Sequence, residues 1–141
     1  MSFLGSMGET MRCYALYRNE KLREYGLVGH QYLYVKLVCR EPGLTQEKVA
    51  KELTFDKSSV ARQLASLEEK GYVRRERNPK DKRVHFVYPT EKAMAVMPRL
   101  EALTVEYIAL IGQDLTSVER KLLDELTEKT NRRAKEAVLE L

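Results

Sequence analysis

KSSVARQLASLEEKGYVRRE, residues 57–76, begins with the pattern of an amphipathic helix and ends in a run of positive charge. Val60, Leu64 and Leu67 recur at i, i+4 and i+7, which puts them on one helical face. The rest of the surface carries small hydroxyls and an arginine, at Ser58, Ser59, Ser66 and Arg62. A merely solvated face would usually carry lysine and glutamate, so we interpret this one as a face that another molecule approaches closely.

The residues before this helix predict a second, shorter helix and a tight turn. Thr45 is a good N-cap, and a helix is expected from there to about Leu53. Only two residues separate it from Asp56, the expected N-cap of the next helix, which should run to Gly71. Two short helices joined in this way are the helix-turn-helix pattern. The usual turn glycine is absent, and Thr54 stands near its position.

The periodicity changes from 3.6 to 2 after Gly71, which predicts a β-hairpin. Strands are expected at 72–77 and 83–88, with a polar, basic tip between them. A lone hairpin is unstable, so its apolar face must pack on the preceding helices. The residues expected on that face are Val84, Phe86 and Tyr88. A helix-turn-helix followed by such a hairpin is a winged helix.

One short segment carries the basic character of the chain. Residues 70–83 hold seven cations and two anions, a net charge of +5, whereas the whole chain carries +4. Such a segment is an electrostatic footprint for a polyanion. Arginine outnumbers lysine there, and arginine favours bidentate contact with phosphate or guanine.

Long helices are expected on both sides of the winged helix. They are predicted at 9–25, 30–40, 90–111, and from a capping box at Thr116 towards the C-terminus. The last helix carries an apolar face of Val118, Leu122, Leu123, Leu126, Ala134 and Val138. Because little of the same chain remains to cover these helices, we expect a second subunit to do so.

Composition argues against several classes of protein. The 141 residues are 43% hydrophobic and 33% charged, which indicates one globular domain. No apolar run approaches the ~20 residues of a membrane span, and the first ten residues do not resemble a signal peptide. We therefore expect a cytoplasmic protein with no membrane partner. Two isolated cysteines, Cys13 and Cys39, and two separated histidines predict neither a metal site nor a cofactor.

The order of these elements and four phrases of the sequence resemble the multiple-antibiotic-resistance regulator (MarR) family of bacterial transcription factors. The phrases are GLTQEKVAKEL, DKSSVARQLASLEEKGYVRRE, NPKDKR and PTEKA, which begin at residues 43, 56, 78 and 89. The resemblance covers about residues 9–138 and implies a mainly α fold with a small β-hairpin wing. It also implies three regions: an N-terminal dimerisation helix at 9–28, a winged helix-turn-helix at 29–89 and C-terminal dimerisation helices at 90–141. Ala93 departs from the glycine frequent there in the family.

The resemblance further implies a homodimeric repressor that binds an inverted repeat in double-stranded DNA. The helix that begins after Asp56 would enter the major groove, and Arg83 would enter the minor groove with Asp81 holding its side chain. The residues implied to contact DNA are Thr45, Gln46, Lys57, Ser58, Ser59, Arg62, Gln63, Arg75, Arg77, Lys80, Asp81, Lys82 and Arg83. For Lys80 and Lys82, a merely solvated loop is the alternative.

The signal that such a repressor would sense has two interpretations. Many members of the family release DNA when a small aromatic acid binds beside the winged domain. The tyrosines that would line that pocket are Tyr14, Tyr17, Tyr25, Tyr32 and Tyr34. The alternative for these side chains is ordinary core.

Cys13 supports the second interpretation. The run from Cys13 to Tyr17 looks like the segment that bears the reactive cysteine in the family's organic-hydroperoxide sensors. Helical i, i+4 spacing would bring the Tyr17 hydroxyl to the thiol. The alternative is a buried, inert cysteine.

Two other classes of function compete with a DNA-binding repressor. A winged helix that serves only as a protein-interaction module would not require arginine at both Arg62 and Arg83. An enzyme would need a nucleophile–base pair, a phosphate-cradling glycine loop or a metal constellation, and the sequence contains none of these patterns.

Overall fold

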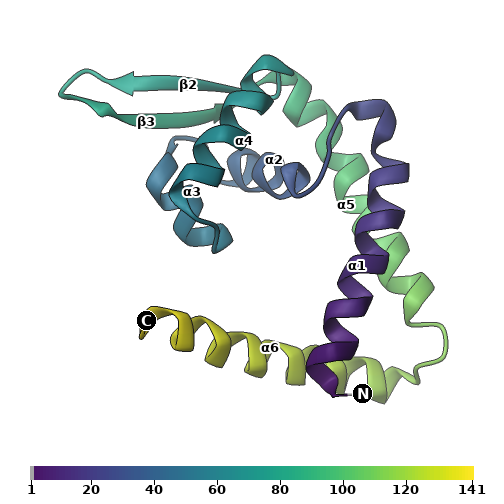
Figure 1. The fold of residues 1–141 in the computed structure, drawn as a ribbon. Coiled ribbons are helices and arrows are strands. Elements are labelled where there is room, and N and C mark those ends of the chain that lie inside the picture. The colour runs from purple at the N-terminus through teal and green to yellow at the C-terminus, as the bar shows by residue number, and fades with distance from the viewer. Residues whose placement is uncertain (1) are drawn as a thin grey trace. The chain divides into compact units, whose positions relative to one another are not determined.

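The computed structural model describes residues 2–141 and is mainly helical, with a small antiparallel sheet (Figure 1). The fold class expected from the sequence is confirmed. In chain order the elements are α1 (Phe3–Lys21), η1 (Arg23–Tyr25), α2 (Gln31–Arg40), β1 (Leu44–Thr45), α3 (Gln46–Leu53), α4 (Lys57–Glu69), β2 (Val73–Asn78), β3 (Asp81–Pro89), α5 (Glu91–Ile111) and α6 (Ser117–Leu139). The chain forms two compact units, and the boundary between them in the sequence falls after Thr104.

Side-chain caps begin the helices at the predicted residues. The Thr45 hydroxyl accepts a hydrogen bond from the Lys48 amide at 3.2 Å and starts α3. Asp56 starts α4 in the same way, with a carboxylate oxygen 2.9 Å from the Ser59 amide. Each cap satisfies a backbone N–H that has no partner within its helix. These caps determine where the two helices of the helix-turn-helix begin.

Thr54 makes the turn between α3 and α4. Its φ of 59° lies in the left-handed region that glycine usually occupies at a helix end. The Phe55 amide then donates to the Ala50 carbonyl at 3.0 Å, which closes the turn. The turn therefore forms without the customary glycine, at some cost in backbone strain.

The core of the first unit lies beneath α4. The predicted stripe of Val60, Leu64 and Leu67 is fully buried. It packs in one hydrophobic cluster with residues of α2, α3 and α5, among them Val35 and Val49. Burying large aliphatic side chains contributes roughly 1.5–3 kcal/mol each, so this stripe holds α4 firmly by one face. The other face is left free for contact.

The sheet has the strand order β1-β3-β2, and all of its pairs are antiparallel. The hairpin of β2 and β3 was predicted, whereas β1, a strand of two residues, was not. The prediction that the Val84, Phe86 and Tyr88 face of β3 packs on the helices was wrong. Val87 is the buried residue of that strand, and Val84, Phe86 and Tyr88 alternate onto the other face, where they are half-buried. Tyr88 lies there under the Arg74 guanidinium, 4.5 Å from the ring centre.

The first helix begins earlier and ends earlier than predicted. It starts at Phe3 after the Ser2 cap, whose hydroxyl accepts from the Gly5 amide at 3.2 Å. It stops at Lys21, and the 3-10 turn η1 completes the segment that the sequence suggested as one helix. Gly26, with a φ of 68°, then reverses the chain towards α2.

The second unit comprises residues 105–141 and exposes a long apolar surface. No residue of α6 is buried within the chain. The exposed large apolar residues of this unit are Val105, Ile108, Leu110, Ile111, Val118, Leu122, Leu123, Leu126, Val138, Leu139 and Leu141. The predicted capping box of Thr116 and Glu119 is confirmed and begins α6.

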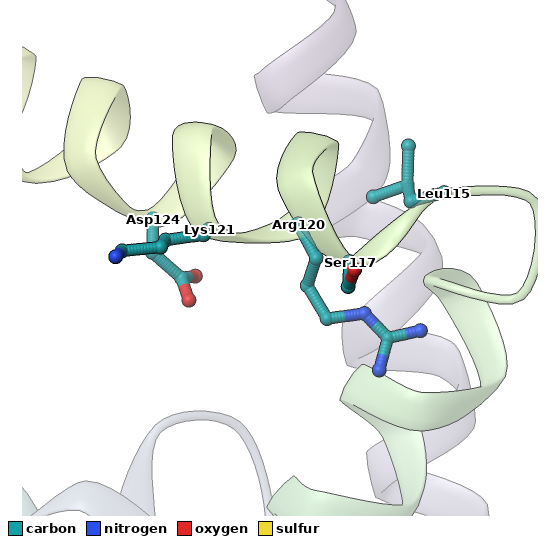
Figure 2. Close-up of a pocket in the computed structure, with 5 residues that line it drawn as sticks. All are labelled: Leu115, Ser117, Arg120, Lys121 and Asp124. Atoms are coloured by element: carbon teal, nitrogen blue, oxygen red, sulfur yellow. The ribbon is translucent and has the colours of Figure 1, made fainter.

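A shallow hollow of about 400 Å³ lies at the start of α6 (Figure 2). It is lined by Leu115, Ser117, Arg120, Lys121 and Asp124. The Arg120 guanidinium donates to the Gly112 carbonyl at 2.8 Å, which ties α6 to the end of α5. None of the helices between residues 2 and 141 is long and apolar enough to cross a membrane.

Candidate nucleic-acid interface

The exposed face of α4 is organised by its own N-cap. The Asp56 carboxylate accepts from the Ser58 hydroxyl at 2.6 Å and from the Ser59 hydroxyl at 2.8 Å. These hydrogen bonds hold the pKa of Asp56 well below its usual range. Both hydroxyl protons are therefore directed to the cap, and the oxygen lone pairs are left to accept from an approaching molecule.

Arg62 continues this chain of hydrogen bonds. It is exposed, and its Nη2 atom donates to the Ser59 hydroxyl at 3.2 Å. Because Ser59 is itself held by Asp56, the guanidinium is ordered from the helix surface outward. The remaining N–H donors of Arg62 face solvent with the planar geometry that suits phosphate or guanine.

Gln63 lies beside Arg62 but is turned partly inward. It is half-buried, and its Oε1 atom accepts from Gln31 Nε2 at 3.0 Å. Lys57, at the start of the same helix, is exposed and pairs with Glu47 at 3.2 Å. An exposed pair of this kind contributes little, so the Lys57 ammonium can exchange Glu47 for another anion.

The tip of the wing carries an arginine, Arg83, that is almost fully exposed. The Arg83 side chain is 91% exposed, yet Asp81 accepts from its Nε at 3.1 Å and from its Nη2 at 3.3 Å. Asp81 also accepts from the Arg83 amide at 3.1 Å, and these bonds lower the pKa of the carboxyl group. Arg77, Lys80 and Lys82 are exposed around this pair. The wing tip is thus a basic projection with one ordered guanidinium.

Arg75 lies in a different environment from that expected of a phosphate-binding residue. Its side chain is only 21% exposed, and its Nη2 donates to Glu68 at 3.1 Å. Its Nη1 donates to Gln46 Oε1 at 2.9 Å, and its Nε is buried without a partner among the described residues. The guanidinium thus joins the wing to α3 and α4, and Gln46 is engaged in the same contact. The sequence could not show this pairing, because the partners lie on other elements.

Thr45 is occupied as the cap of α3, so its hydroxyl already accepts one hydrogen bond. The amides of the first turn of α3 remain the groups that could meet a phosphate there.

The five tyrosines expected in a ligand pocket do not share one environment. Tyr34 is buried and stacks on Phe55, with 5.8 Å between ring centres. Tyr25 contributes its backbone carbonyl to the Tyr72 hydroxyl at 2.5 Å. Tyr17 lies under the Lys21 ammonium, 5.5 Å from the ring centre. Tyr34 is therefore a core residue rather than a pocket wall.

Tyr14 and Tyr32 instead enclose a residue that sequence reasoning missed. The Arg18 guanidinium lies 5.0 Å from the Tyr14 ring centre and 4.4 Å from that of Tyr32. Arg18 is only 2% exposed, and its Nη1 donates to the Tyr32 hydroxyl at 3.4 Å. In the part of the chain that the structure describes, no carboxylate pairs with it and its Nε has no hydrogen-bond partner. The i, i+4 spacing of Tyr14 and Arg18 is the signal that could have revealed it.

The two cysteines differ in accessibility. Cys13 is exposed on α1, which is contrary to the buried alternative considered for it. Cys39 is half-buried, and burial raises the pKa of its thiol. Cys13 is thus the more accessible of the two to a reagent in solvent.

Comparison with known proteins agrees with this architecture. A family model described as "MarR family" matches residues 25–84. The uncharacterized HTH-type transcriptional regulator YybA of Bacillus subtilis is 30% identical over 125 residues, which cover 87% of this chain and 82% of YybA. The crystal structure of the transcriptional regulator SlyA is 28% identical, with a TM-score of 0.91 over 97% of this chain and 96% of that chain.

A third similar protein has been solved with nucleic acid. It is a MarR family transcriptional regulator from Listeria monocytogenes complexed with 26mer DNA. It is 23% identical, with a TM-score of 0.88 over 99% of this chain and 93% of that chain. At that identity the likeness extends to the fold.

Proposed function

The chain belongs to the MarR family of DNA-binding transcriptional regulators, and on that premise we propose that it is a homodimeric repressor of an inverted-repeat operator. In this proposal residues 29–89 bind DNA, and residues 9–28 and 90–141 form the dimer. It is a regulator and not an enzyme. The observation that carries the proposal is that two exposed arginines are each ordered by a neighbouring side chain: Arg62 on α4 by Ser59, and Arg83 at the wing tip by Asp81.

Helix α4 would enter the major groove with its exposed face. The small side chains at Ser58 and Ser59 let the helix approach the base edges closely, and Arg62 is ordered towards them through Ser59. The firmly buried opposite face supports this role, because a helix that reads bases must be rigidly held. A fold-level neighbour complexed with DNA adds support.

The wing would lie along the flanking minor groove. Asp81 orders the Arg83 guanidinium without burying it, so little side-chain entropy is left to lose on binding. Lys80, Lys82 and Arg77 would add phosphate attraction that depends on salt but not on sequence. Arg75 would act indirectly, by fixing the wing on α4 through Glu68.

A second copy of the chain would cover the apolar surface of the second unit. The exposed aliphatic residues of α6 include Leu122, Leu123 and Leu126 on one helical face. Large exposed apolar residues gathered on one helical face mark an interface. A two-fold dimer would present two α4 helices to one side of the duplex, as an inverted repeat requires.

The effector would be a small aromatic acid bound beside Arg18. A buried guanidinium without an anion bears a desolvation cost, and a carboxylate would offset it. The rings of Tyr14 and Tyr32 would flank the aromatic part of such a ligand. The ligand would cause release of DNA if it bound more tightly to an arrangement of the dimer in which the two α4 helices cannot reach both half-sites at once.

Selection of bound duplexes from a random pool tests the DNA-binding proposal. We expect an inverted repeat with half-sites centred about 10 bp apart. Recovery of unrelated sequences, with affinity that depends only on salt, would contradict it. Titration of the selected complex with salicylate then tests the effector site. Release should occur with the parent protein and not with Arg18→Met, whereas equal release from both would exclude Arg18 as the binding group.

A further inference from the structure

Gln31 is a buried polar residue beneath α4 that the proposed DNA contacts do not use. It is 2% exposed and lies at the start of α2. Its Nε2 donates to Gln63 Oε1 at 3.0 Å and to the Ser66 hydroxyl at 3.1 Å. Its Oε1 accepts from the Val28 amide at 3.2 Å and from the Lys70 ammonium at 2.8 Å. All of its hydrogen-bonding capacity is thus directed at α4 and the loop before α2.

The orientation of the Gln31 amide follows from the chemistry of its partners. A backbone N–H and a lysine ammonium can only donate, so the atom of Gln31 that faces Val28 and Lys70 must be the oxygen. The other atom, facing Gln63, must then be the nitrogen. This conclusion does not depend on telling oxygen from nitrogen in the side chain itself.

The orientation of the Gln63 amide follows in turn. Because Gln31 donates a hydrogen bond to Gln63, the Gln63 atom that accepts it must be the oxygen. The Gln63 NH2 group therefore points away from Gln31. Among the described residues, Gln63 Nε2 has no hydrogen-bond partner, and it is not counted among the buried unsatisfied atoms. Gln63 follows Arg62 in the chain and is half-buried, so part of its side chain remains accessible to solvent. Gln63 therefore has its oxygen turned towards Gln31 and its NH2 donors turned away from it.

We propose that Gln31 is a specificity-determining residue, because it locks the Gln63 amide as a donor towards the DNA. This inference rests on the proposed entry of α4 into the major groove. A glutamine that is free to use both atoms reads adenine through N6 and N7. With its oxygen held inward by Gln31, Gln63 directs its NH2 donors outward, and it suits a base edge made of acceptors. Guanine, with O6 and N7, offers two of them, whereas cytosine offers the N4 donor.

Amide-proton exchange in the free protein tests the orientation without DNA. In a 15N-labelled full-length chain, we expect the Gln31 side-chain NH2 to be protected from exchange and the Gln63 NH2 to exchange rapidly. Protection of the Gln63 NH2 would overturn the proposal whatever the DNA result. This arm needs no substitution, so a variant that fails to fold cannot obscure it.

The base preference of the protein on the selected operator tests whether Gln63 favours a base that offers acceptors. Gln63→Glu replaces the outward NH2 donor by carboxylate acceptors. The operator position at which this variant and the parent protein prefer different bases is therefore the one that residue 63 contacts. At that position the parent protein should prefer guanine over cytosine by about tenfold, the scale of one mismatched pair.

Gln31→Glu is the decisive variant. Its carboxylate can still accept from Val28 and Lys70, but it cannot donate to Gln63. The Gln63 amide should turn its NH2 inward and its oxygen outward, and the preference should move towards cytosine or adenine. Gln113→Glu, in the exposed α5–α6 connection, carries the same change of charge outside the winged helix and should keep the parent's preference.

The outcomes separate this inference from the proposed function. A parent protein that selects no sequence overturns the proposed function and the base reading with it. A sequence-specific parent whose preference is unchanged in a folded Gln31→Glu variant overturns only the role of Gln31. Circular dichroism and thermal melting establish that the variant is folded. If it is not folded, Gln31→Met serves instead and should broaden the preference.

Discussion

Asp81 holds Arg83 by three hydrogen bonds while leaving the arginine side chain 91% exposed. An exposed ion pair of this kind adds little to folding stability. Its effect is to order a long side chain at the end of a hairpin, where it would otherwise be free. The relationship therefore fits a binding role better than a structural one.

Arg83→Ala should weaken operator binding by about 1–3 kcal/mol and leave the free energy of unfolding unchanged. The reason is the loss of one groove contact by a side chain that is 91% exposed, so its removal uncovers little buried surface. Fluorescence anisotropy with a labelled operator measures the first quantity, and urea denaturation the second.

Asp81→Ala provides the control for that prediction. It removes a negative charge from a basic tip, so simple attraction to phosphate would predict tighter binding. We expect weaker binding, because Arg83 loses its ordering partner. Tighter binding by Asp81→Ala would show that Asp81 is only an unfavourable charge.

Arg75 and Lys82 should respond differently to substitution, although both are basic residues of the wing. Arg75→Ala should lower the free energy of unfolding by about 1–2 kcal/mol, because Glu68 and Gln46 lose a half-buried partner. Lys82→Ala should leave stability unchanged. It should reduce the slope of log affinity against log salt by about one per subunit. A reduced slope for Arg75→Ala, without loss of stability, would return Arg75 to the group of phosphate contacts.

Local chemistry explains which elements the sequence could predict. Thr45 and Asp56 are strong caps followed by clear 3.6-residue periodicity, so both helices of the helix-turn-helix could be placed closely. The strand face could not be assigned, because Phe86 and Val87 are adjacent apolar residues and either alternation is possible. The two-residue strand β1 has no periodicity of its own, and only pairing with Val87 and Phe86 defines it.

The residues of the candidate site likewise fall into those that the sequence could reveal and those that only the fold reveals. Asp81 and Arg83 are two residues apart, so their pairing was accessible from the sequence. Arg75 is seven residues from Glu68 and on another element, and its burial depends on how the wing packs. Arg18 was overlooked because a lysine or arginine on a helix is usually solvated. Only the fold brings Tyr32 across to cover it.

Removal of residues 116–141 should convert a dimer into a monomer. The apolar face of α6 is exposed within one chain, and its burial would drive association. Leu126→Lys should weaken the dimer in the same direction, whereas Glu128→Gln, which also changes the charge by +1 but on the opposite side of α6, should not. Sedimentation equilibrium measures both. A stable DNA-binding monomer after the truncation would contradict the dimer proposal.

Cys13 should not control DNA binding, although it is exposed. Only a thiolate reacts readily with peroxide, and reactive cysteines have cations or hydrogen-bond donors that stabilise it. Among the described residues no such hydrogen bond to the Cys13 thiol is found. We therefore expect organic hydroperoxide to leave the operator complex intact in a retardation gel. Release by peroxide in the parent and in Cys39→Ser, but not in Cys13→Ser, would establish a redox switch instead of an aromatic effector.

Hydroxyl-radical footprinting on the selected operator tests the central claim most directly. We expect two equivalent protected regions related by the two-fold axis of the operator, centred about one helical turn apart, with protection extending into the flanking minor grooves. The flanking protection should disappear with Arg83→Ala, while the central regions remain. A single unpaired footprint, or flanking protection that is unchanged in Arg83→Ala, would contradict a dimer that reads the major groove with α4 and the minor groove with the wing.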